Sequence, residues 1–395
     1  MRLVNPLAAH YSRFRVAERL LLTGHSHQAW PDVALEGQVE ALEDAARHVD
    51  DKWERAFAKA EAVRDGYRRL LVDPGGELAL GTNTHELVLR FLSALDLRAR
   101  PRLISTDGEF HTLRRQLGRL AEEDLDVVRL PAEPADTLAE RLAAAVDERT
   151  SAVLVSAVLF ETSQVVPGID ALAEACARAG AELLVDAYHA LGAIPFAIHE
   201  LELGSAWIVG GGYKYLQLGE GNCFLRLPAH ADDLRPAITG WFAEFAQLAD
   251  EHDTTRVGYG TGAERFAGST YDPTSHYRAA RVFAFFAEQG LTPERLRGSY
   301  RRQVDLLAAR FDALDAPDAL ITRDRETPLD RYGAFLALRS PVAGEVDRAL
   351  AQRGVMVDSR GPWLRLGPAP YLADAQLEAA VEHLGDALAA AELNA

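Results

Sequence analysis

The sequence predicts an α/β protein in which a large domain, built on a parallel or mixed sheet, precedes a smaller C-terminal α+β domain. Between residues 77 and 227, short apolar runs alternate with amphipathic stretches, as they do where strands and helices follow one another along the chain. From about residue 275 the pattern changes to long helical stretches with a few short strands. At 395 residues, the chain also exceeds the usual size of a single hydrophobic core.

The elements expected in the large domain follow from these periodicities. Residues 31–72 predict two helices, because Pro31 suits a helix start and apolar residues recur at helical spacing. Runs rich in β-formers predict strands at Glu77–Leu80, Arg102–Ser105, Asp126–Leu130, Ala152–Phe160, Glu182–Val185, Ala206–Val209 and Cys223–Leu227. The stretches between them predict helices at His85–Leu95, Thr112–Ala121, Asp136–Val146 and Ile169–Ala179.

The C-terminal part predicts two long helices, two short strands and a final helix. These elements cover Tyr277–Gln289, Pro293–Leu314, Gly333–Leu338, Val355–Asp358 and the residues from Ala373 onward. We therefore expect an N-terminal arm (residues 1–30), a large domain (31–275) and a small domain (276–395).

Composition argues against several classes of function. The net charge of −17, without a long basic run, disfavours nucleic acid and anionic membranes as partners. Cys176 and Cys223 are too few for a disulfide framework or a multi-cysteine metal site, and both lie in apolar surroundings typical of a core. No apolar stretch is long enough to span a bilayer, and no secretory signal is seen, so we expect a cytoplasmic protein without a metal site.

Lys214 is the most informative residue for function. It lies in Gly-Gly-Gly-Tyr-Lys-Tyr-Leu (210–216), a glycine-rich turn after a predicted strand, and an upstream strand ends at Asp186. A pyridoxal phosphate (PLP) enzyme needs such a pair, because the lysine forms the Schiff base and the aspartate keeps the pyridine nitrogen protonated. A solvated loop lysine and a helix-capping aspartate are the simpler alternatives.

Further candidate cofactor contacts lie near strand ends. Thr82 and Asn83 precede a predicted helix, where free backbone N–H groups and a hydroxyl make an anion site; an ordinary helix N-cap is the alternative. Phe110 follows a strand and is placed to stack on a cofactor ring, unless it is a core aromatic. His189 comes three residues after Asp186, and it either supports that acid or is a structural histidine.

Three more residues carry donor groups that suit a ligand. Trp241, in Ile-Thr-Gly-Trp-Phe, and Thr270, in Gly-Ser-Thr, look like loop residues able to bond a phosphate, although packing or a surface turn explains each more simply. Arg365 lies in an otherwise apolar stretch and offers a fork of donors for the carboxylate of an amino acid. A structural ion pair is the alternative for Arg365, and Arg360 competes for the same role.

With these residues in place, the chain resembles kynureninase, a fold type I PLP enzyme of the aminotransferase class V superfamily, from about Leu21 to Leu384. The resemblance implies the type I transferase fold, with a mixed seven-stranded sheet in the large domain. It is carried by Val-Asp-Ala-Tyr-His-Ala-Leu-Gly (185–192), Tyr-Lys-Tyr-Leu-Gln-Leu-Gly-Glu-Gly (213–221), Gly-Trp-Phe (240–242), Arg-Gly-Val-Met-Val-Asp (353–358) and Arg-Leu-Gly-Pro-Ala-Pro-Tyr (365–371).

The resemblance implies a role for each matching residue. Lys214 is the Schiff-base lysine, Asp186 the pyridinium partner, and Tyr213 the tyrosine that contacts the phosphate and serves proton transfer. Arg365 matches the arginine that grips the substrate carboxylate. The implied cofactor-binding set is Thr82, Asn83, Phe110, Asp186, His189, Tyr213, Lys214, Trp241 and Thr270, with Trp241 and Thr270 coming from the neighbouring subunit of a homodimer.

The chain departs from the family mainly on the substrate side. The family's Asn-Ser-Leu-Gly segment reads His-Ser-His-Gln here (25–28), which leaves Ser26 as a candidate substrate contact. Its Tyr-Thr-Gly loop reads Glu-Thr-Ser (161–163). After its stacking phenylalanine the family has Pro and then a second aspartate, whereas this chain has His-Thr-Leu (111–113). His48, in His-Val-Asp-Asp-Lys-Trp, is aligned with a substrate-pocket histidine.

The implied activity is cleavage of the Cβ–Cγ bond of L-kynurenine, 3-hydroxykynurenine or a ring-substituted analogue, which yields an anthranilate and L-alanine in tryptophan catabolism. Lys214, Asp186 and Tyr213 would be the catalytic residues. The altered substrate-side segments keep a second hypothesis open, a class V aminotransferase or β-lyase acting on another amino acid. A catalytically silent PLP-fold protein is a third hypothesis, and the intact Lys214 and Asp186 argue against it.

Overall fold

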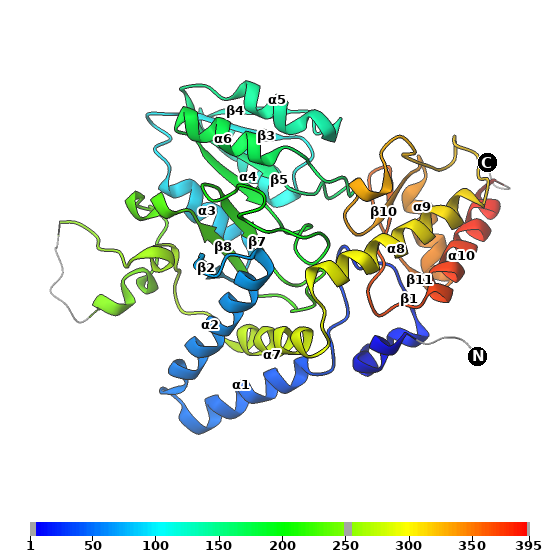
Figure 1. Ribbon diagram of the computed structural model, residues 1–395, viewed down its shortest axis with the longest axis horizontal. Helices are drawn as coiled ribbons and strands as arrows, with labels where there is room; N and C mark the ends of the chain where they lie inside the picture. The colour runs from blue at the N-terminus through cyan, green and yellow to red at the C-terminus, as the bar shows by residue number, and fades with distance from the viewer. Residues whose placement is uncertain (1–4, 249–254, 393–395) are drawn as a thin grey trace.

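The structure, a computed structural model, describes residues 5–248 and 255–392 and is organised around one large sheet (Figure 1). The seven strands lie in the order β2-β8-β7-β6-β5-β3-β4, and β8 runs antiparallel to both of its neighbours while the other pairs are parallel. The mixed seven-stranded sheet expected from the sequence is therefore confirmed. Its strands are β2 (Glu77–Gly81), β3 (Arg102–Thr106), β4 (Asp126–Leu130), β5 (Thr150–Ser156), β6 (Glu182–Asp186), β7 (Trp207–Gly210) and β8 (Cys223–Leu227).

Helices cover both faces of this sheet, which explains why the strands read as continuous apolar runs. On one face, α3 (Thr84–Ala94) and α4 (His111–Ala121) pack against side chains such as Leu154. On the other face, α5 (Leu138–Ala145) and α6 (Ile169–Ala179) pack against the alternate side chains of the same strands, such as Val153. All seven residues of β5 are buried, so this strand lies at the centre of the core.

The strand expected at Ala152–Phe160 is four residues too long at its C-terminal end. The apolar run continues because residues 157–160 are buried, but they leave the sheet ladder after β5. The amide of Ala157 still donates to the carbonyl of Asp186, and Val158 forms an isolated antiparallel bridge with Val165. Burial without regular pairing therefore explains the error in the predicted length.

The small domain contains a four-stranded antiparallel sheet, in the order β12-β13-β10-β9, with three helices beside it. Its strands are β9 (Thr322–Arg323), β10 (Leu336–Arg339), β12 (Asp358–Arg360) and β13 (Trp363–Leu366), and its helices are α8 (Pro293–Asp312), α9 (Ala343–Gln352) and α10 (Asp374–Glu392).

The N-terminal segment pairs with elements of the small domain. After the short helices η1 (Pro6–Phe14) and η2 (Val16–Glu18), strand β1 (Leu20–Leu21) pairs in parallel with β11 (Val355–Met356). The pairing continues to an isolated bridge between Thr23 and Gly367. In Figure 1 the N-terminal segment accordingly lies beside the C-terminal elements.

One helix begins at the expected domain boundary at residue 275. Helix α7 (Thr274–Glu288) packs against α1 (Ala34–His48) and α2 (Lys52–Leu71), so it belongs with the large domain (Figure 1). The helices approach closely: a Cβ added at Gly37 would lie 2.5 Å from the carbonyl oxygen of Tyr277. The sequence assigned α7 to the small domain because helical periodicity does not reveal which helix a face will meet.

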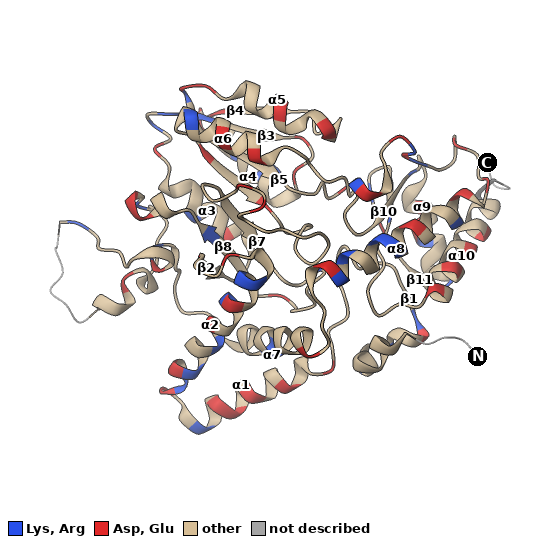
Figure 2. Ribbon diagram, viewed as in Figure 1, with Lys and Arg blue, Asp and Glu red and all other residues tan. Residues whose placement is uncertain are grey.

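The acidic excess of the chain is spread over its helices. Figure 2 shows acidic residues along much of α1, whereas α8 carries both signs. Within residues 5–248 and 255–392, no helix combines the length and apolar character that crossing a membrane requires.

A buried ion pair joins the end of α2 to the sheet and provides a test of the fold. The Nε of Arg226 donates to Oδ2 of Asp73 over 2.9 Å, and both side chains are 8% exposed. Replacing Asp73 by Ala leaves a buried cation without its partner, so the free energy of unfolding should fall by about 3–5 kcal/mol in urea denaturation of the cofactor-free protein. The exposed pair Arg119–Glu123 is the control, because Glu123→Ala should cost less than about 1 kcal/mol. Equal costs for the two variants would contradict this assignment.

Candidate active site

A cavity of about 1190 Å³ opens where β2, β3, β5 and β6 end. Ligands of α/β sheets commonly bind at the carboxyl ends of parallel strands, because the loops that follow the strands converge there. The structure brings seven of the predicted site residues to the lining of this cavity: Thr82, Asn83, Phe110, Asp186, His189, Tyr213 and Lys214.

The loop that carries Lys214 is packed tightly against the sheet. A Cβ at Gly211 would lie 2.5 Å from Sγ of Cys223 and 2.6 Å from Oη of Tyr188, so only glycine lets the loop lie this close. Lys214 itself is 5% exposed, and its Nζ lies 3.1 Å from Nε2 of His189. The run of glycines therefore places a buried amine in the cavity.

Burial governs the charge of Lys214. Removal from water lowers the pKa of its amine to about 7, although the carboxylate of Asp186 opposes this shift. The Lys214 amine lies 4.6 Å from the ring centre of Tyr188 and 5.2 Å from that of Phe110. The pKa of His189 is also lowered by burial and by the neighbouring lysine, so this histidine is neutral. An amine of this kind is a nucleophile and a base at neutral pH.

Asp186 lies at the end of β6 and is the natural partner of a bound cation. Its Oδ1 accepts a hydrogen bond from the backbone N–H of Tyr188 over 2.8 Å. Burial raises the pKa of this carboxyl group, against the opposing effects of the Tyr188 amide and of Lys214. A buried carboxylate is costly without a positive partner, and a protonated ring nitrogen would supply one.

The N-terminus of α3 offers an anion site next to Lys214. Asn83 caps this helix, since its Oδ1 accepts from the N–H of Glu86 over 2.9 Å. The hydroxyl of Thr82 and the amide of Asn83 also donate to the carboxylate of Glu86, over 2.8 and 3.2 Å. A phosphate at this helix end would take the place of Glu86 as their acceptor.

A buried polar network fixes the lysine loop to the rest of the molecule. Gln217 has a left-handed φ of 60°, and its Oε1 accepts from Oη of Tyr11 over 2.5 Å. Its Nε2 donates to Oε1 of Gln28 over 2.9 Å, and Gln28 in turn donates to Oη of Tyr300 over 2.8 Å. The N-terminal segment and α8 of the small domain therefore both hold the loop in place.

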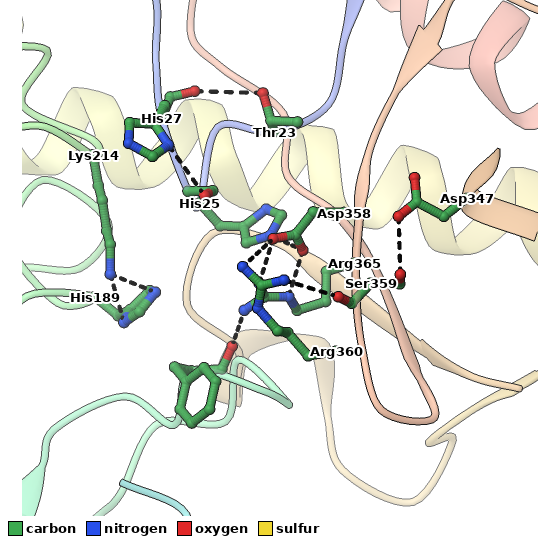
Figure 3. Close-up of polar contacts among 12 residues, drawn as sticks. Thr23, His25, His27, His189, Lys214, Asp347, Asp358, Ser359, Arg360 and Arg365 are labelled. Carbon is green, nitrogen blue, oxygen red and sulfur yellow. Dashed lines mark hydrogen bonds and ion pairs between the residues drawn. The ribbon is translucent and has the colours of Figure 1, made fainter. Parts of the chain in front are cut away.

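Arg365 approaches from the small domain, held in a fixed orientation (Figure 3). It lies directly opposite Asp358 in the β12–β13 register, and its Nε and Nη2 donate to Asp358 over 2.7 and 2.6 Å. Its Nη1 donates to the carbonyl of Phe160 over 2.6 Å. A guanidinium has five N–H donors, so these three bonds leave two on the terminal nitrogens. Arg365 therefore has an ion pair and retains donors for a second carboxylate.

His25 supports Asp358 from behind. Its Nε2 lies 3.0 Å from Oδ1 of Asp358. Burial lowers the pKa of His25 to about 4, so it is neutral and donates through Nε2, while Arg365 and His25 hold the pKa of Asp358 far below its usual range. The second nitrogen of His25 is buried and has no hydrogen-bond partner among the described residues.

Five predicted residues are not among those that line this cavity: Arg365, Ser26, His48, Trp241 and Thr270. Ser26 bonds Nδ1 of His27, whose ring stacks on Tyr213 at 4.9 Å, so the N-terminal segment comes close to the cavity. His48 ends α1, Trp241 is 42% exposed, and Thr270 lines a separate cavity of about 600 Å³. Within the chain, their assigned contacts therefore stay predictions.

The sequence analysis did not single out several residues that shape the site. Asp358 bonds to both His25 and Arg365, Phe160 supplies a carbonyl to Arg365, and the buried Glu109 bonds to Ser156. Asp358 had a usable signal, because residues opposite each other across a hairpin such as 358–365 pair directly. Glu109 had none, because an acid in Thr-Asp-Gly-Glu reads as part of a solvated turn.

Comparisons with known proteins agree with this geometry. No protein-family model matches the chain. Isopenicillin N epimerase of Streptomyces clavuligerus is 29% identical over 82% of this chain and 83% of its own, and kynureninase of Salinispora tropica is 28% identical over 81% and 80%. The uncharacterised aminotransferase YcbU of Bacillus subtilis is 23% identical over 86% and 87%.

Solved structures share the fold at low identity. The cystine C–S lyase C-DES, with glycine covalently linked to its PLP cofactor, superposes with a TM-score of 0.83 at 15% identity, covering 96% of this chain and 99% of its own. The cysteine desulfurase of Thermococcus onnurineus gives 0.80 at 18% identity, covering 99% of both chains.

Together the comparisons support an enzyme of the PLP-dependent fold type I superfamily, aminotransferase class V, and PLP as its cofactor. The cavity fits that cofactor on independent grounds. The amine of Lys214 is only partly charged at neutral pH, Asp186 is a half-buried acid that lacks a full cationic partner, and the N-terminus of α3 offers an anion site.

The lowered pKa of Lys214 predicts how the cofactor-free protein captures PLP. The neutral amine is the attacking form, so the rate of capture should rise through about pH 7 and then level off. An ordinary lysine would keep gaining rate up to its reference pKa of about 10.4. Borohydride trapping at timed intervals, followed by peptide mass analysis, measures capture at Lys214, and Lys214→Ala is the control. A rate that still climbs above about pH 9 would show that the amine is solvated.

Proposed function

We propose that this chain, an enzyme of the PLP-dependent class V superfamily, is a hydrolase of the kynureninase type that acts on L-kynurenine, 3-hydroxykynurenine or a ring-substituted analogue. The observation that carries the proposal is the buried amine of Lys214 beside Asp186, with Arg365 close enough for its charge to lower the pKa of that amine. The Tyr-Lys-Tyr-Leu and Gly-Trp-Phe motifs and the kynureninase relative support the narrower assignment.

Three groups of residues would hold the cofactor. Lys214 would bind its aldehyde carbon, Asp186 would face its ring nitrogen, and Thr82 with Asn83 would contact its phosphate. When bound, PLP supplies an electron sink for the bonds broken next to the substrate's amino group. A homodimer, in which Trp241 and Thr270 of one subunit reach the phosphate side of the other, is part of the proposal.

Lys214 would then act as the base. Whenever its amine is not bound to the cofactor, a pKa of about 7 would leave a substantial fraction of it unprotonated at neutral pH and able to accept the Cα proton. His189 lies 3.1 Å from this amine and keeps it oriented. A lysine with an ordinary pKa would be protonated at the same pH and could not serve as the base.

Arg365 would bind the substrate's carboxylate. Asp358 and the Phe160 carbonyl hold the guanidinium still, and the two remaining N–H groups point from its terminal nitrogens. A fixed carboxylate orients the bonds at Cα, which lowers the entropic cost of reaching the transition state. Because Asp358 already neutralises Arg365, the second carboxylate gains directional hydrogen bonds more than net charge attraction.

Tyr213 is the candidate acid for the leaving carbon. Burial raises the pKa of its hydroxyl to about 12, so the group keeps its proton at neutral pH and has one to give. In the overall reaction, water adds its oxygen to the side-chain carbonyl, the Cβ–Cγ bond breaks, and Cβ receives a proton. The products are an anthranilate and L-alanine, and no electrons are gained or lost.

A class V aminotransferase or β-lyase acting on another amino acid is the second candidate. The His-Ser-His-Gln segment (25–28) favours it, because its His27 stacks on Tyr213, close to where a substrate would lie. A desulfurase that uses a thiolate is disfavoured, because burial raises the pKa of Cys223 to about 12 and that of Cys176 to about 12.

The two candidates differ in their products. Purified holoenzyme incubated with kynurenine or 3-hydroxykynurenine should release a fluorescent anthranilate without any keto-acid acceptor. Lys214→Ala should show no turnover, a loss of at least about 10³-fold, because base and attachment point are removed together. No anthranilate from either compound, with amino transfer from other amino acids to a keto acid, would replace the first candidate by the second.

Substitution of Arg365 tests the substrate contact. Arg365→Gln removes charge-assisted hydrogen bonds worth about 1.5–3 kcal/mol, so KM should rise about 10- to 100-fold with a smaller change in kcat. The matched control is Arg360→Gln, because Arg360 lies on the neighbouring strand and is 46% exposed at 3.6 Å from Asp358. We expect its KM to change less than about threefold. The reverse pattern would assign the carboxylate to Arg360.

A further inference from the structure

Glu109 is a buried acid for which the proposed reaction has no role. It lies between β3 and α4, directly before Phe110, and is 1% exposed. Its Oε1 accepts from the hydroxyl of Thr106 over 2.7 Å and from the N–H of Ser156 over 3.2 Å. Its Oε2 accepts from the hydroxyl of Ser156 over 2.5 Å. One carboxyl group therefore joins the ends of β3 and β5 and bonds to Ser156, which lines the cavity.

This acid is next to Asp186 through the sheet. Ser156 pairs directly with Asp186 in the parallel β5–β6 register, and both residues line the cavity. Asp186 is the charged residue whose field acts on Glu109, and Lys214 is the cation that acts on Asp186. Asp186 therefore lies between a buried acid and an amine that is itself only partly charged at neutral pH.

We propose that Glu109 is a positioning residue that acts through Asp186: it holds the extra proton of this two-acid pair, so that Asp186 stays ionised towards the cavity. The proposal rests on the cofactor site of the proposed function and is independent of the substrate. Two like charges this close in a medium of low polarity do not both ionise freely. The hydroxyls of Thr106 and Ser156 can rotate to accept from a protonated Glu109, so both forms are satisfied.

The titration of Glu109 makes the proposal measurable without substrate. Burial, and then the charge of Asp186, raise the pKa of Glu109 to about 7, although the Ser156 and Thr106 hydroxyls oppose the shift. The unfolded chain binds this proton only below about pH 4.3. The folded chain therefore holds more protons between those values, and its stability falls as pH rises from about 4.3 to 7.

Glu109→Gln tests both aspects of the role. Gln keeps the Oε1 acceptor and can donate to Ser156 through its amide, so the fold is retained. In the cofactor-free protein, stability measured by thermal unfolding falls between about pH 5 and pH 8, and the variant should lose the part of this fall that Glu109 contributes. In the holoenzyme, the visible absorbance of bound PLP should lose the part of its pH dependence that lies near pH 7, because wild-type Glu109 gives up its proton there and Gln has none to lose.

Two further variants separate charge from packing. Ser105→Ala, in β3, removes a buried hydroxyl bond to the carbonyl of Leu154 in β5. It should lower stability equally at both pH values while leaving the absorbance titration unchanged. Ser156→Ala removes a donor that favours ionised Glu109 and should extend the downward stability slope to higher pH.

The proposal is overturned if Glu109→Gln keeps the wild-type stability slope or leaves the absorbance titration unchanged. Neither measurement requires turnover of kynurenine, so a wrong substrate assignment would leave this result intact. Failure of the protein to bind PLP at all would instead refute the proposed function, and the stability slope of the cofactor-free protein would still report on Glu109.

Discussion

The exclusion of water from the amine of Lys214 is the constraint on which the rest of the site depends. In water this amine would be charged, and Asp186 would be an ordinary carboxylate. Inside the cavity neither charge is stable alone, so each group's ionisation depends on the other and on whatever cation binds between them. The close approach of Gly211 to Cys223 and Tyr188 creates this dry environment. Backbone packing thus sets the chemistry before any ligand arrives.

The sheet places the other residues of the site around this amine. Parallel strands end at a common edge, and the register of β5 and β6 places Ser156 beside Asp186 without any contribution from the loops. The other half of the site comes from the small domain, whose hairpin fixes Arg365 opposite Asp358. The site therefore requires both domains, and the Gln217 network holds the lysine loop between them. Strands and helices fix the positions of the cofactor-side residues, while substrate specificity is assigned to loop segments such as residues 25–28.

The features predictable from the sequence were those encoded locally. Alternating apolar runs identified the sheet strands, and the glycines before Lys214 identified a loop with a special conformation. What escaped prediction depends on distant contacts. Predicting that α7 packs on α1 and α2 requires knowledge of the surface it faces. Predicting that Glu109 is buried requires the position of Ser156, which is 47 residues away in the chain. The sequence identified Arg365 as a hydrogen-bond donor. Its partner Asp358 lies on another strand, and only the pairing of β12 with β13 reveals the contact.

The parallel pairing of β1 with β11 has a consequence for biosynthesis. Residues near the beginning of the chain complete a domain whose remaining strands and helices are synthesised last. During translation, Leu20 and Leu21 cannot pair with β11 until more than three hundred further residues have been synthesised. The large domain can condense in the meantime, because its sheet is contiguous in the chain. The pairing of β1 with β11 therefore depends on synthesis of both segments, and it completes the domain that also carries Arg365.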